Sequence, residues 1–343
     1  MVARLSRFQF SYTFNLTPCQ KFIRLHFYET SYQNLDRSKA FFSVKVGSFT
    51  LLSNFSTSLA SNFSDQEIIL KELCVDVQEN QILNITFTPS QDYRDSYAFI
   101  NGIEIVSMLL NLYYTTATGD TDYPFMGQTA GSLYSLSNSN ALETVHRVNV
   151  GRNFISARED TGMYRTWSDD ISYLTEAISA LFLLTLLFNP VLAGLHFCEF
   201  QQEITVIGNR IFEIYIANQM AEKGADVIGW GDGSGVLVYM DYAVTMGSKS
   251  NQKKQNLSIA LCPTPTYMTN YSDAILNGVE IFKVDSSGSL AEPNPNPWTN
   301  PTMVAPPTPG NNHSNNRKIL IVVVAGVVSS FIAVSVVLLF IRR

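Results

Sequence analysis

The sequence predicts an all-β fold made of two similar domains in tandem, followed by a stalk and one membrane-spanning helix. Aromatic residues make up 12% of the 343 residues, and long stretches rich in Ala, Glu and Lys are missing, which favours strands over helices. Four short blocks recur in the same order in the second half of the chain, and the last long segment is apolar and uncharged. A chain of this length accommodates about two domains of ordinary size.

The recurring blocks define the two copies. The blocks are Leu25–Glu29 with Leu195–Glu199, Phe41–Val46 with Ile211–Ile216, Leu83–Phe87 with Leu257–Leu261, and Phe99–Ile105 with Ile275–Ile281. Their offset is 170 residues for the first two pairs, 174 for the third and 176 for the fourth. Such an offset indicates a duplicated domain, because solenoid repeats are about 20 to 50 residues long. We expect a first domain over residues 1–116, a connector over 117–134 and a second domain over 135–285.

Each block has the composition of a β-strand. Phe22–Tyr28 is largely apolar or aromatic on both faces, and Ile211–Ile216 is rich in β-branched and aromatic residues. Asn101-Gly102 and Asn277-Gly278 each stand between short apolar runs, and Asn and Gly tolerate the positive φ of a type I′ turn. They predict two β-hairpins within two antiparallel β-sandwich or jelly-roll domains.

The carboxy-terminal part predicts a stalk and a membrane anchor. Residues 286–316 are rich in Pro, Asn, Ser and Thr and have too little apolar content to pack, which indicates an extended, disordered, partly polyproline stalk. Residues 319–341 carry no charge, and a helix of 23 residues crosses a bilayer core of roughly 30 Å. Basic residues flank the span on both sides, so they do not set its orientation.

Sequons and cysteines favour an extracellular position for everything before the span. The candidates for N-glycosylation are Asn15, Asn54, Asn62, Asn84, Asn256, Asn270 and Asn312. The candidates for two disulfides, in any of three pairings, are Cys19, Cys74, Cys198 and Cys262, which as free thiols would also suit strands. The first residues lack the apolar segment of a secretory signal, so we expect a chain that is incomplete at its beginning or is exported by another route.

Charge and motifs bear on other function classes. A net charge of −6 without any long basic run argues against nucleic-acid binding. Gly229–Gly235 lacks the Gly-Lys-Ser/Thr of a phosphate loop and is interpreted as a plain loop. Glu159-Asp160 and Asp169-Asp170 are the only candidates for the carboxylate couple of a glycosidase, and adjacent carboxylates more often hold turns. We expect no catalytic residue and no cofactor.

Two further groups of residues have a structural interpretation beside the functional one. His196, Cys198 and Cys262 could be drawn as metal ligands, but the first copy keeps only the histidine, as His26, so we interpret the histidines as structural and expect no metal site. Aromatic residues between the copies could stack on sugar rings, whereas packing between the domains is the simpler interpretation. These aromatic residues are Tyr113, Tyr114, Tyr123 and Phe125.

The blocks RLHFYE and LHFCEF, the segments FINGIEI and ILNGVEIFKV, and the stretch from Asn149-Val150-Gly151 through Glu159–Trp167 resemble a known family. It is the malectin-like ectodomain of plant receptor-like kinases of the Catharanthus roseus type, and the resemblance covers most of the chain. It implies tandem malectin-like jelly rolls outside the cell, one span and a cytoplasmic Ser/Thr kinase. It also implies cell-wall sensing and binding of secreted cysteine-rich peptides together with glycolipid-anchored co-receptors.

The sequence departs from the family pattern in three places. It begins some strands into the first domain, and residues 171–194 replace a longer segment that holds the opening strands of the second domain. We interpret this stretch as a spliced or wrongly joined junction that puts the second sandwich in doubt. The chain also ends two residues past the predicted span, without the Gly-rich loop, the Val-Ala-Ile-Lys strand or the His-Arg-Asp loop of a kinase.

We therefore expect a receptor-type ectodomain without its own kinase, held at the plasma membrane by one span with the amino-terminal part outside. Its expected ligands are a cell-wall polysaccharide or a secreted peptide. The alternatives are a truncated decoy that pairs with a co-receptor or a full-length receptor, a carbohydrate-active enzyme using Glu159 and Asp160, and an incomplete gene product.

Overall fold

A computed structural model describes residues 2–291 apart from gaps at 33–34, 65–67, 80–81, 109–120, 128–130, 138, 152, 161, 176–179, 187–189, 246–254 and 286–287. The predicted span and most of the predicted stalk lie outside the described residues. Among the residues that are described, no helix combines the length and the apolar character that a membrane crossing requires.

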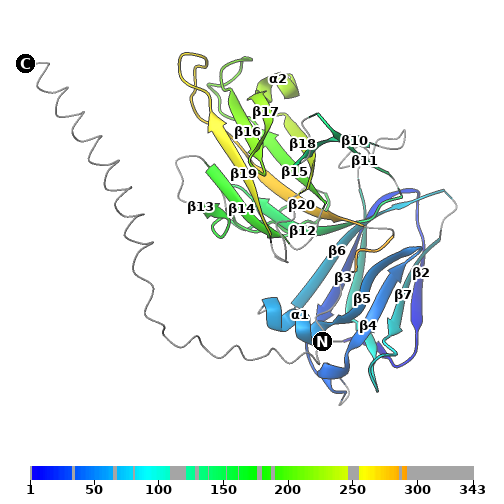
Figure 1. The fold of residues 1–343 in the computed structure, drawn as a ribbon. Helices are drawn as coiled ribbons and strands as arrows, with labels where there is room; N and C mark the ends of the chain where they lie inside the picture. The colour runs from blue at the N-terminus through cyan, green and yellow to red at the C-terminus, as the bar shows by residue number, and fades with distance from the viewer. Residues whose placement is uncertain are drawn as a thin grey trace, which may run out of the picture. The chain divides into compact units, whose positions relative to one another are not determined.

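The described part is mostly β-structure, as predicted (Figure 1). The first copy contains β1 (Arg4–Ser6), β2 (Phe10–Asn15), β3 (Cys19–Tyr28), η1 (Arg37–Lys39), β4 (Phe41–Val46), β5 (Phe49–Ser56), α1 (Thr57–Ser64), β6 (Ile68–Val77), β7 (Ile82–Pro89), β8 (Ala98–Ile100) and β9 (Gly102–Ser107). The rest contains β10 (Thr121–Met126), β11 (Leu133–Leu136), β12 (Leu142–Asn149), β13 (Leu174–Thr175), β14 (Ala180–Leu186), β15 (Val191–Cys198), β16 (Phe212–Ile216), β17 (Gln219–Ala225), α2 (Val227–Gly231), β18 (Leu237–Val244), β19 (Gln255–Pro263) and β20 (Gly278–Val284).

The strands build two sandwiches that share one sheet. In the first sandwich the sheet β2-β7-β4-β5 packs on β6-β3-β9, and in the second the sheet β13-β14-β19-β16-β17 packs on β18-β15-β20. The two three-strand groups belong to one nine-stranded sheet of order β11-β10-β18-β15-β20-β12-β6-β3-β9. The copies are therefore joined edge to edge by backbone hydrogen bonds.

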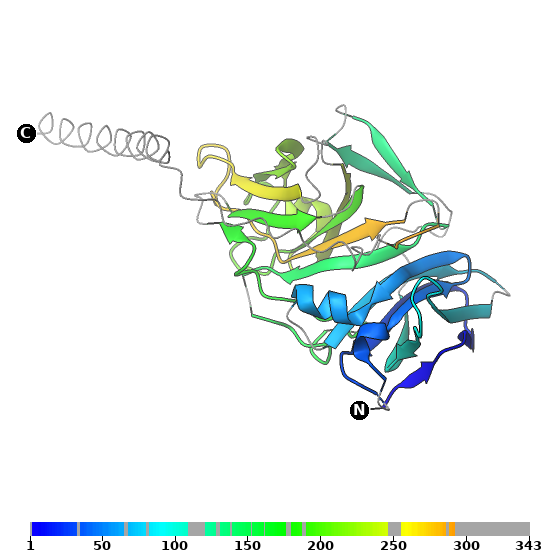
Figure 2. The same cartoon turned by 60° about the horizontal axis from the view of Figure 1, so that its bottom comes forward.

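The seam between the copies is the pairing of β6 with β12, which Figures 1 and 2 show where the cyan strand meets the green one. It consists of two residue pairs, Leu142 with Cys74 and Glu143 with Leu73. Part of the predicted connector also joins the sheet, because β10 pairs in parallel with β18 and antiparallel with β11. The segment between the copies thus contributes strands as well as linkage.

Equivalent residues pair between strands in the same way in both copies. Phe10 pairs with Phe87 in the first copy, and Ala180 pairs with Leu261 in the second, at offsets of 170 and 174 residues. In the same way His26 lies opposite Gly102, and His196 lies opposite Gly278. The duplication predicted from four blocks therefore extends to strands that carry no recognisable sequence similarity.

The stretch 171–194 needs a correction. It was expected to leave the second sandwich in doubt, but it supplies β13, β14 and the first half of β15. Strand β14 pairs with β19 along its whole length, in the place that β2 holds beside β7. Its run of apolar residues suits a strand, and the second sandwich has the same strand order as the first.

The two predicted Asn-Gly hairpins are wrong. Neither Asn101-Gly102 nor Asn277-Gly278 has the positive φ that a type I′ turn requires. Strand β8 pairs with β1 while β9 pairs with β3, so the chain runs on past Asn101 and changes sheets. Each asparagine instead completes the neighbouring strand, because Asn101 Oδ1 accepts from the Tyr28 N–H at 2.8 Å and Asn277 Oδ1 accepts from the Cys198 N–H at 2.6 Å.

Strand β3 shows how the sequence sets two buried faces. Its residues Ile23, Leu25 and Phe27 point into the core of the first sandwich. Phe22 and Arg24 are also buried, on the opposite face of the nine-stranded sheet. Successive side chains of a strand alternate between faces, so a strand buried on both sides must place its charged residue in a polar layer.

Candidate functional site

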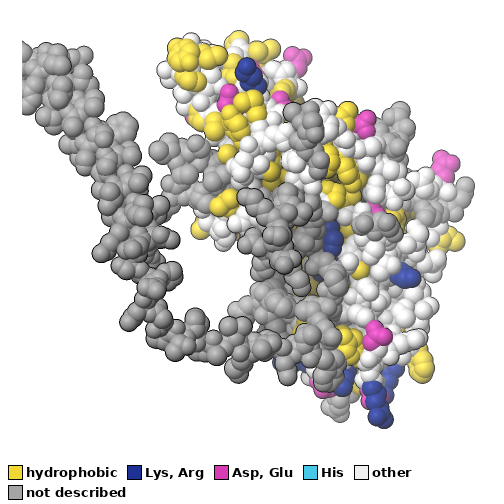
Figure 3. Space-filling model, viewed as in Figure 1, with side chains coloured by type: hydrophobic (Ala, Val, Ile, Leu, Met, Phe, Trp, Pro, Cys, Tyr) yellow, Lys and Arg dark blue, Asp and Glu magenta, His cyan; other side chains and the backbone are white. Residues whose placement is uncertain are grey.

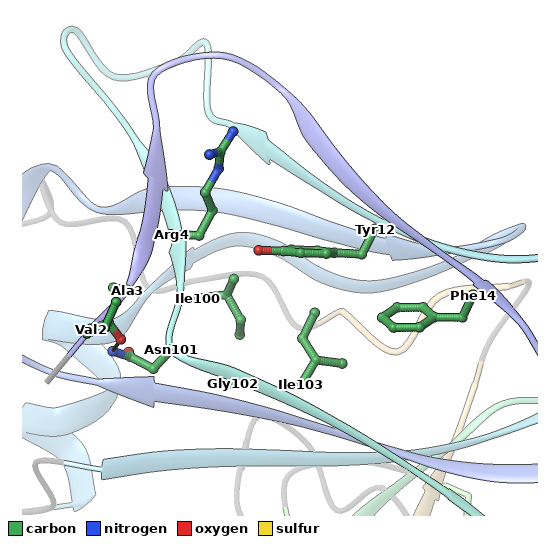
Figure 4. Close-up of a pocket in the computed structure, with 9 residues that line it drawn as sticks. All are labelled: Val2, Ala3, Arg4, Tyr12, Phe14, Ile100, Asn101, Gly102 and Ile103. Atoms are coloured by element: carbon green, nitrogen blue, oxygen red, sulfur yellow. Dashed lines mark hydrogen bonds between the residues drawn. The ribbon is translucent and has the colours of Figure 1, made fainter.

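An open pocket lies beside the first sandwich, between β2 and the junction of β8 and β9 (Figure 4). Its volume is about 350 Å³. The rings of Tyr12 and Phe14 face Ile100 and Ile103 across it, and the side chain of Arg4 lies at one end. Aromatic and aliphatic walls with one or two polar groups are typical of small-ligand sites.

The alternation of β2 explains the aromatic wall of this pocket. Phe10, Tyr12 and Phe14 are half-buried, whereas the residues between them are exposed, as expected for a strand with one face to solvent. Asn101 at the floor is held in place, because its Nδ2 donates to the Val2 carbonyl at 3.0 Å and to the Tyr32 hydroxyl at 2.8 Å. The polar groups left for a ligand are the Tyr12 hydroxyl and the exposed guanidinium of Arg4, which lies 5.8 Å from the centroid of the Phe10 ring.

A layer of buried charges covers the outer face of the nine-stranded sheet near the seam. Glu72 of β6 accepts from Arg24 at 2.6 Å and from Arg147 of β12 at 2.7 Å. Arg147 also pairs with Glu280 of β20. Burial alone would raise the pKa of Glu72, but the charges and hydrogen bonds of Arg147 and Arg24 outweigh this effect and lower the pKa. The layer is thus an ion-pair network that ties the sandwiches together.

Both copies repeat a histidine–glutamate pair on this face of the sheet, partly exposed in the first copy and buried in the second. His26 Nε2 lies 3.1 Å from Glu104 Oε1, and His196 Nε2 lies 2.8 Å from Glu280 Oε2. Burial would raise the pKa of Glu280, but Arg147 and His196 hold it far below its usual range. Among the described residues no cluster of His, Cys, Asp and Glu is suited to a metal ion. His196 binds a carboxylate, which agrees with its structural interpretation.

The segment after β12 covers this charged layer and contains the predicted glycosidase carboxylates. Asp160 accepts from Arg165 and from the Trp167 indole, while Glu159 accepts from the Ser156 N–H at 2.9 Å. Burial would raise the pKa of Asp160, but the hydrogen bonds of Arg165 lower it. Hydrogen bonds from Ser156 lower the pKa of Glu159. Neither group is adapted to donate a proton, and both hold turns.

The other aromatic and loop candidates that the structure describes pack within the fold. Tyr123 is buried in the cluster between the copies, and Phe125 packs on Tyr134 with ring centroids 5.3 Å apart. Tyr113 and Tyr114 lie outside the described residues. Gly229–Gly235 begins within α2 and continues as a turn, with Trp230 packed on Phe197 at 5.5 Å between ring centroids.

No disulfide joins any two of the four candidate cysteines, all of which are among the described residues. Cys74 is buried on the outer face of the nine-stranded sheet, with its sulfur 3.1 Å from that of Met108. Cys19 lies three residue pairs away on β3 and accepts from Lys21 Nζ at 2.9 Å. Cys198 and Cys262 belong to different sheets of the second sandwich. The cysteines thus have the alternative role in strands that the sequence left open.

The sequons lie mostly on the smaller sheets. Asn15 and Asn84 are exposed on β2 and β7, and Asn256 is exposed on β19. Asn270 is exposed in the loop after β19, and Asn62 lies in α1. Asn54 on β5 is half-buried, and its Nδ2 donates to Asp92 at 2.9 Å. Asn312 lies outside the described residues.

Exposed apolar side chains gather at one end of the second sandwich. Val206, Ile207, Tyr267 and Met268 are 61%, 67%, 83% and 62% exposed, on two loops that we call the apolar tip. The loops are joined because Thr269 donates to the carbonyl of Gly208 at 3.1 Å. Figure 3 shows hydrophobic atoms around the loop that follows β19. Exposed apolar surface of this kind often marks a partner site.

Sequence reasoning missed the pocket, the apolar tip and the charged layer. The apolar residues of the tip stand among polar loop residues, and their neighbourhood depends on contacts between distant loops. A signal for the charged layer was present, because Arg24 interrupts an otherwise apolar strand. The other members of the layer, Glu72, Arg147 and Glu280, come from three other strands, and only the sheet order brings them together with Arg24.

Comparisons with known proteins agree with this architecture. The family described as "Malectin-like domain" matches residues 6–182. The receptor-like protein kinase FERONIA of Arabidopsis thaliana is 38% identical over 355 aligned residues, which cover 90% of this chain and 38% of FERONIA. The chain therefore spans well under half of the length of this relative.

Solved structures show the same fold. A crystal structure of the plant peptide RALF23 in complex with FER and LLG2 matches with a TM-score of 0.72 and 35% identity, over 85% of this chain and 86% of the matched chain. The extracellular domain of ANXUR2 from Arabidopsis thaliana matches with a TM-score of 0.73 and 28% identity, over 85% of this chain and 86% of that one.

Proposed function

The chain belongs to the malectin-like family, and from this premise we propose that it is the ligand-binding extracellular part of a plant cell-surface receptor. The ligand we propose is a secreted peptide, bound together with a co-receptor. The observation that carries this proposal is the likeness to the FER chain crystallised with RALF23 and LLG2, which extends over both sandwiches.

The geometry supports a binding role. The charged layer and the shared sheet join the two sandwiches. The carboxylates of Glu159 and Asp160 hold turns. The apolar tip offers surface that a partner would cover. Binding platforms commonly place recognition on loops held by a rigid scaffold.

The test is a binding experiment with the full chain, a synthetic RALF-type peptide and a purified LLG-type co-receptor. We expect the chain to bind the peptide more tightly when the co-receptor is present. Replacing Ile207 and Tyr267 by Ser should weaken the ternary complex at least tenfold. Tyr164→Ser, which changes an aromatic residue outside the tip that is 60% exposed, should leave it unchanged. Absence of binding by the unmodified chain would overturn the proposed function. Unchanged binding by the tip variant would show that the partner contacts a surface other than the apolar tip.

A second candidate function, carbohydrate binding, is favoured by the pocket of Figure 4. Tyr12 and Phe14 present ring faces on which a sugar can stack, and Arg4 can bind a hydroxyl or a uronic-acid carboxylate. Titration with cell-wall oligosaccharides, including oligogalacturonides, tests this idea. Tyr12→Ala should abolish binding while the exposed Phe154→Ala leaves it unchanged. Equal binding by both variants would reject the pocket as the site.

The membrane anchor remains part of the proposal. We propose that residues 319–341 span the plasma membrane, that residues 286–316 form a stalk, and that the sandwiches carry glycans at exposed sequons. A chain anchored in this way could also act as a decoy or pair with a full-length receptor. Glycosidase treatment and protease protection of intact cells would test the topology.

A further inference from the structure

The two copies differ in chemistry at one buried place. In the second copy Glu199 follows β15, and its carboxylate binds Arg210, with both side chains buried. Arg210 also binds Asp273, with 2.8 Å from Nε to Oδ1 and 2.8 Å from Nη2 to Oδ2. Gln201 also accepts from Nη2, so all three nitrogens of the guanidinium donate, as expected for a buried arginine.

The first copy lacks two of these three residues. The offsets of the repeat place Glu29 at the position of Glu199, Ala40 at that of Arg210 and Tyr97 at that of Asp273. The glutamate is therefore retained, while the arginine that should neutralise it has become an alanine.

Local hydrogen bonds confirm this alignment. The Ser90 N–H donates to the Phe41 carbonyl at 2.8 Å, and its counterpart Thr264 donates to Ile211 at 3.1 Å. Next to Tyr97 and Asp273, the hydroxyl of Ser96 donates to the Ser90 carbonyl and that of Ser272 to the Thr264 carbonyl. The same backbone therefore surrounds a different set of side chains in the two copies.

Glu29 consequently has a buried oxygen without a hydrogen bond. Its side chain is 4% exposed, and its Oε1 has no hydrogen-bond partner in the described part of the chain. The hydroxyl of Tyr97, which is 1% exposed, also has none there. Among the described residues the cation within 4.0 Å is Arg37, whose Nε lies 3.9 Å from Oε1 and whose side chain is 59% exposed. A buried carboxylate is costly unless a cation or donors satisfy it.

We infer that Glu29 and the Tyr97 hydroxyl form a binding site for a guanidinium group supplied by another molecule, at the position that Arg210 fills in the second copy. The second copy shows that this backbone accommodates a guanidinium against the glutamate. The approach of Arg37 shows that an exposed arginine reaches the same oxygen from the surface. Burial and the Glu29 charge raise the pKa of Tyr97 to about 12, so its phenol stays neutral beside the carboxylate. The inference stands apart from the peptide function proposed above.

The test uses the full chain and the probe N-acetyl-arginine amide, with the citrulline compound as the neutral control of the same shape. Ligand-observed NMR should show binding of the arginine probe and none of the citrulline compound. Glu29→Gln should weaken binding at least tenfold, and Arg37→Ala should strengthen it several-fold because it removes the internal competitor. Glu203→Gln, at an exposed acid of the second copy, should leave binding unchanged.

A second variant keeps the test independent of stability effects. Ala40→Arg combined with Tyr97→Asp rebuilds the triad of the second copy, so it should abolish probe binding and raise the thermal midpoint. Equal affinity for the arginine and citrulline probes would overturn the proposed site. An unchanged affinity of the Glu29→Gln variant or of the rebuilt triad for the arginine probe would also overturn it.

Discussion

Glu72 of the first sandwich accepts a hydrogen bond from Arg147 of the second, with 2.7 Å between Oε1 and Nη2. Both side chains are almost fully buried, and Arg24 binds the other carboxylate oxygen. This contact joins the copies through side chains at the same place where β6 and β12 join them through the backbone.

Removing this carboxylate should strongly destabilise the chain. Glu72→Ala leaves Arg24 and Arg147 buried without their shared partner, and the expected loss is about 3 to 5 kcal/mol in the free energy of unfolding. Glu104→Ala is the matched control, because that side chain is 53% exposed, and it should cost less than about 1 kcal/mol. Urea denaturation measures both, and a similar loss for the two variants would contradict the role of the network.

Asp241 should make the stability fall as the pH rises. Burial raises its pKa from 3.8 to about 6, although His196 partly opposes this, so the folded state binds the proton more tightly than the unfolded state. The folded state is therefore favoured at low pH and loses that advantage as pH rises through about 6. Asp241→Asn should raise the free energy of unfolding at pH 7.5, by at most about 3 kcal/mol, and change it little near pH 3.5. A gain of equal size at both pH values would argue against this origin.

The repeat supplies a matched pair of glycine variants. A Cβ at position 278 would lie 2.9 Å from Trp167 Cζ3, whereas one at position 102 would lie 3.6 Å from His26. Gly278→Ala should therefore cost about 1 to 3 kcal/mol through overpacking, and Gly102→Ala should cost far less. Thermal unfolding followed by circular dichroism compares the two, and equal costs would show that the Trp167 ring moves aside freely.

Thiol labelling should find four reactive cysteines in the unfolded chain without any reductant. In the folded chain Cys74 should be protected, because it is buried, while Cys19, Cys198 and Cys262 should react slowly as half-buried thiols. Mass spectrometry after alkylation counts the labels. Recovery of only two labelled cysteines after unfolding would restore the disulfide interpretation for the remaining pair.

The sequence predicted the β class and the duplication because both depend on local patterns. Alternating or doubly apolar runs such as Phe22–Tyr28 identify strands wherever they stand, and a conserved order of blocks survives drift in loop length. Strand β14 escaped this reasoning because its apolar run has no clear period. It is a strand because it pairs with β19.

Features that depend on tertiary contacts were beyond sequence patterns. Asn101-Gly102 has the local signature of a hairpin, but the first residue caps a neighbouring strand while the chain changes sheets. The partners of Arg24 come from other strands and from the covering segment, so their neighbourhood follows from the strand order. The oxygen of Glu29 that lacks a hydrogen bond among the described residues is likewise a tertiary feature, because its counterpart Glu199 binds Arg210 from a different segment.

The short seam between the sandwiches has a mechanical consequence. Strand β20, the last of the described strands, pairs with β12 along seven residue positions, while β12 pairs with β6 through only two. Tension applied along the chain would be shared by seven residue pairs in the β12–β20 ladder but by only two in the β6–β12 ladder. Of these two ladders, the β6–β12 ladder should therefore open first when the sandwiches are pulled apart, and the buried pair of Glu72 and Arg147 is what resists that opening.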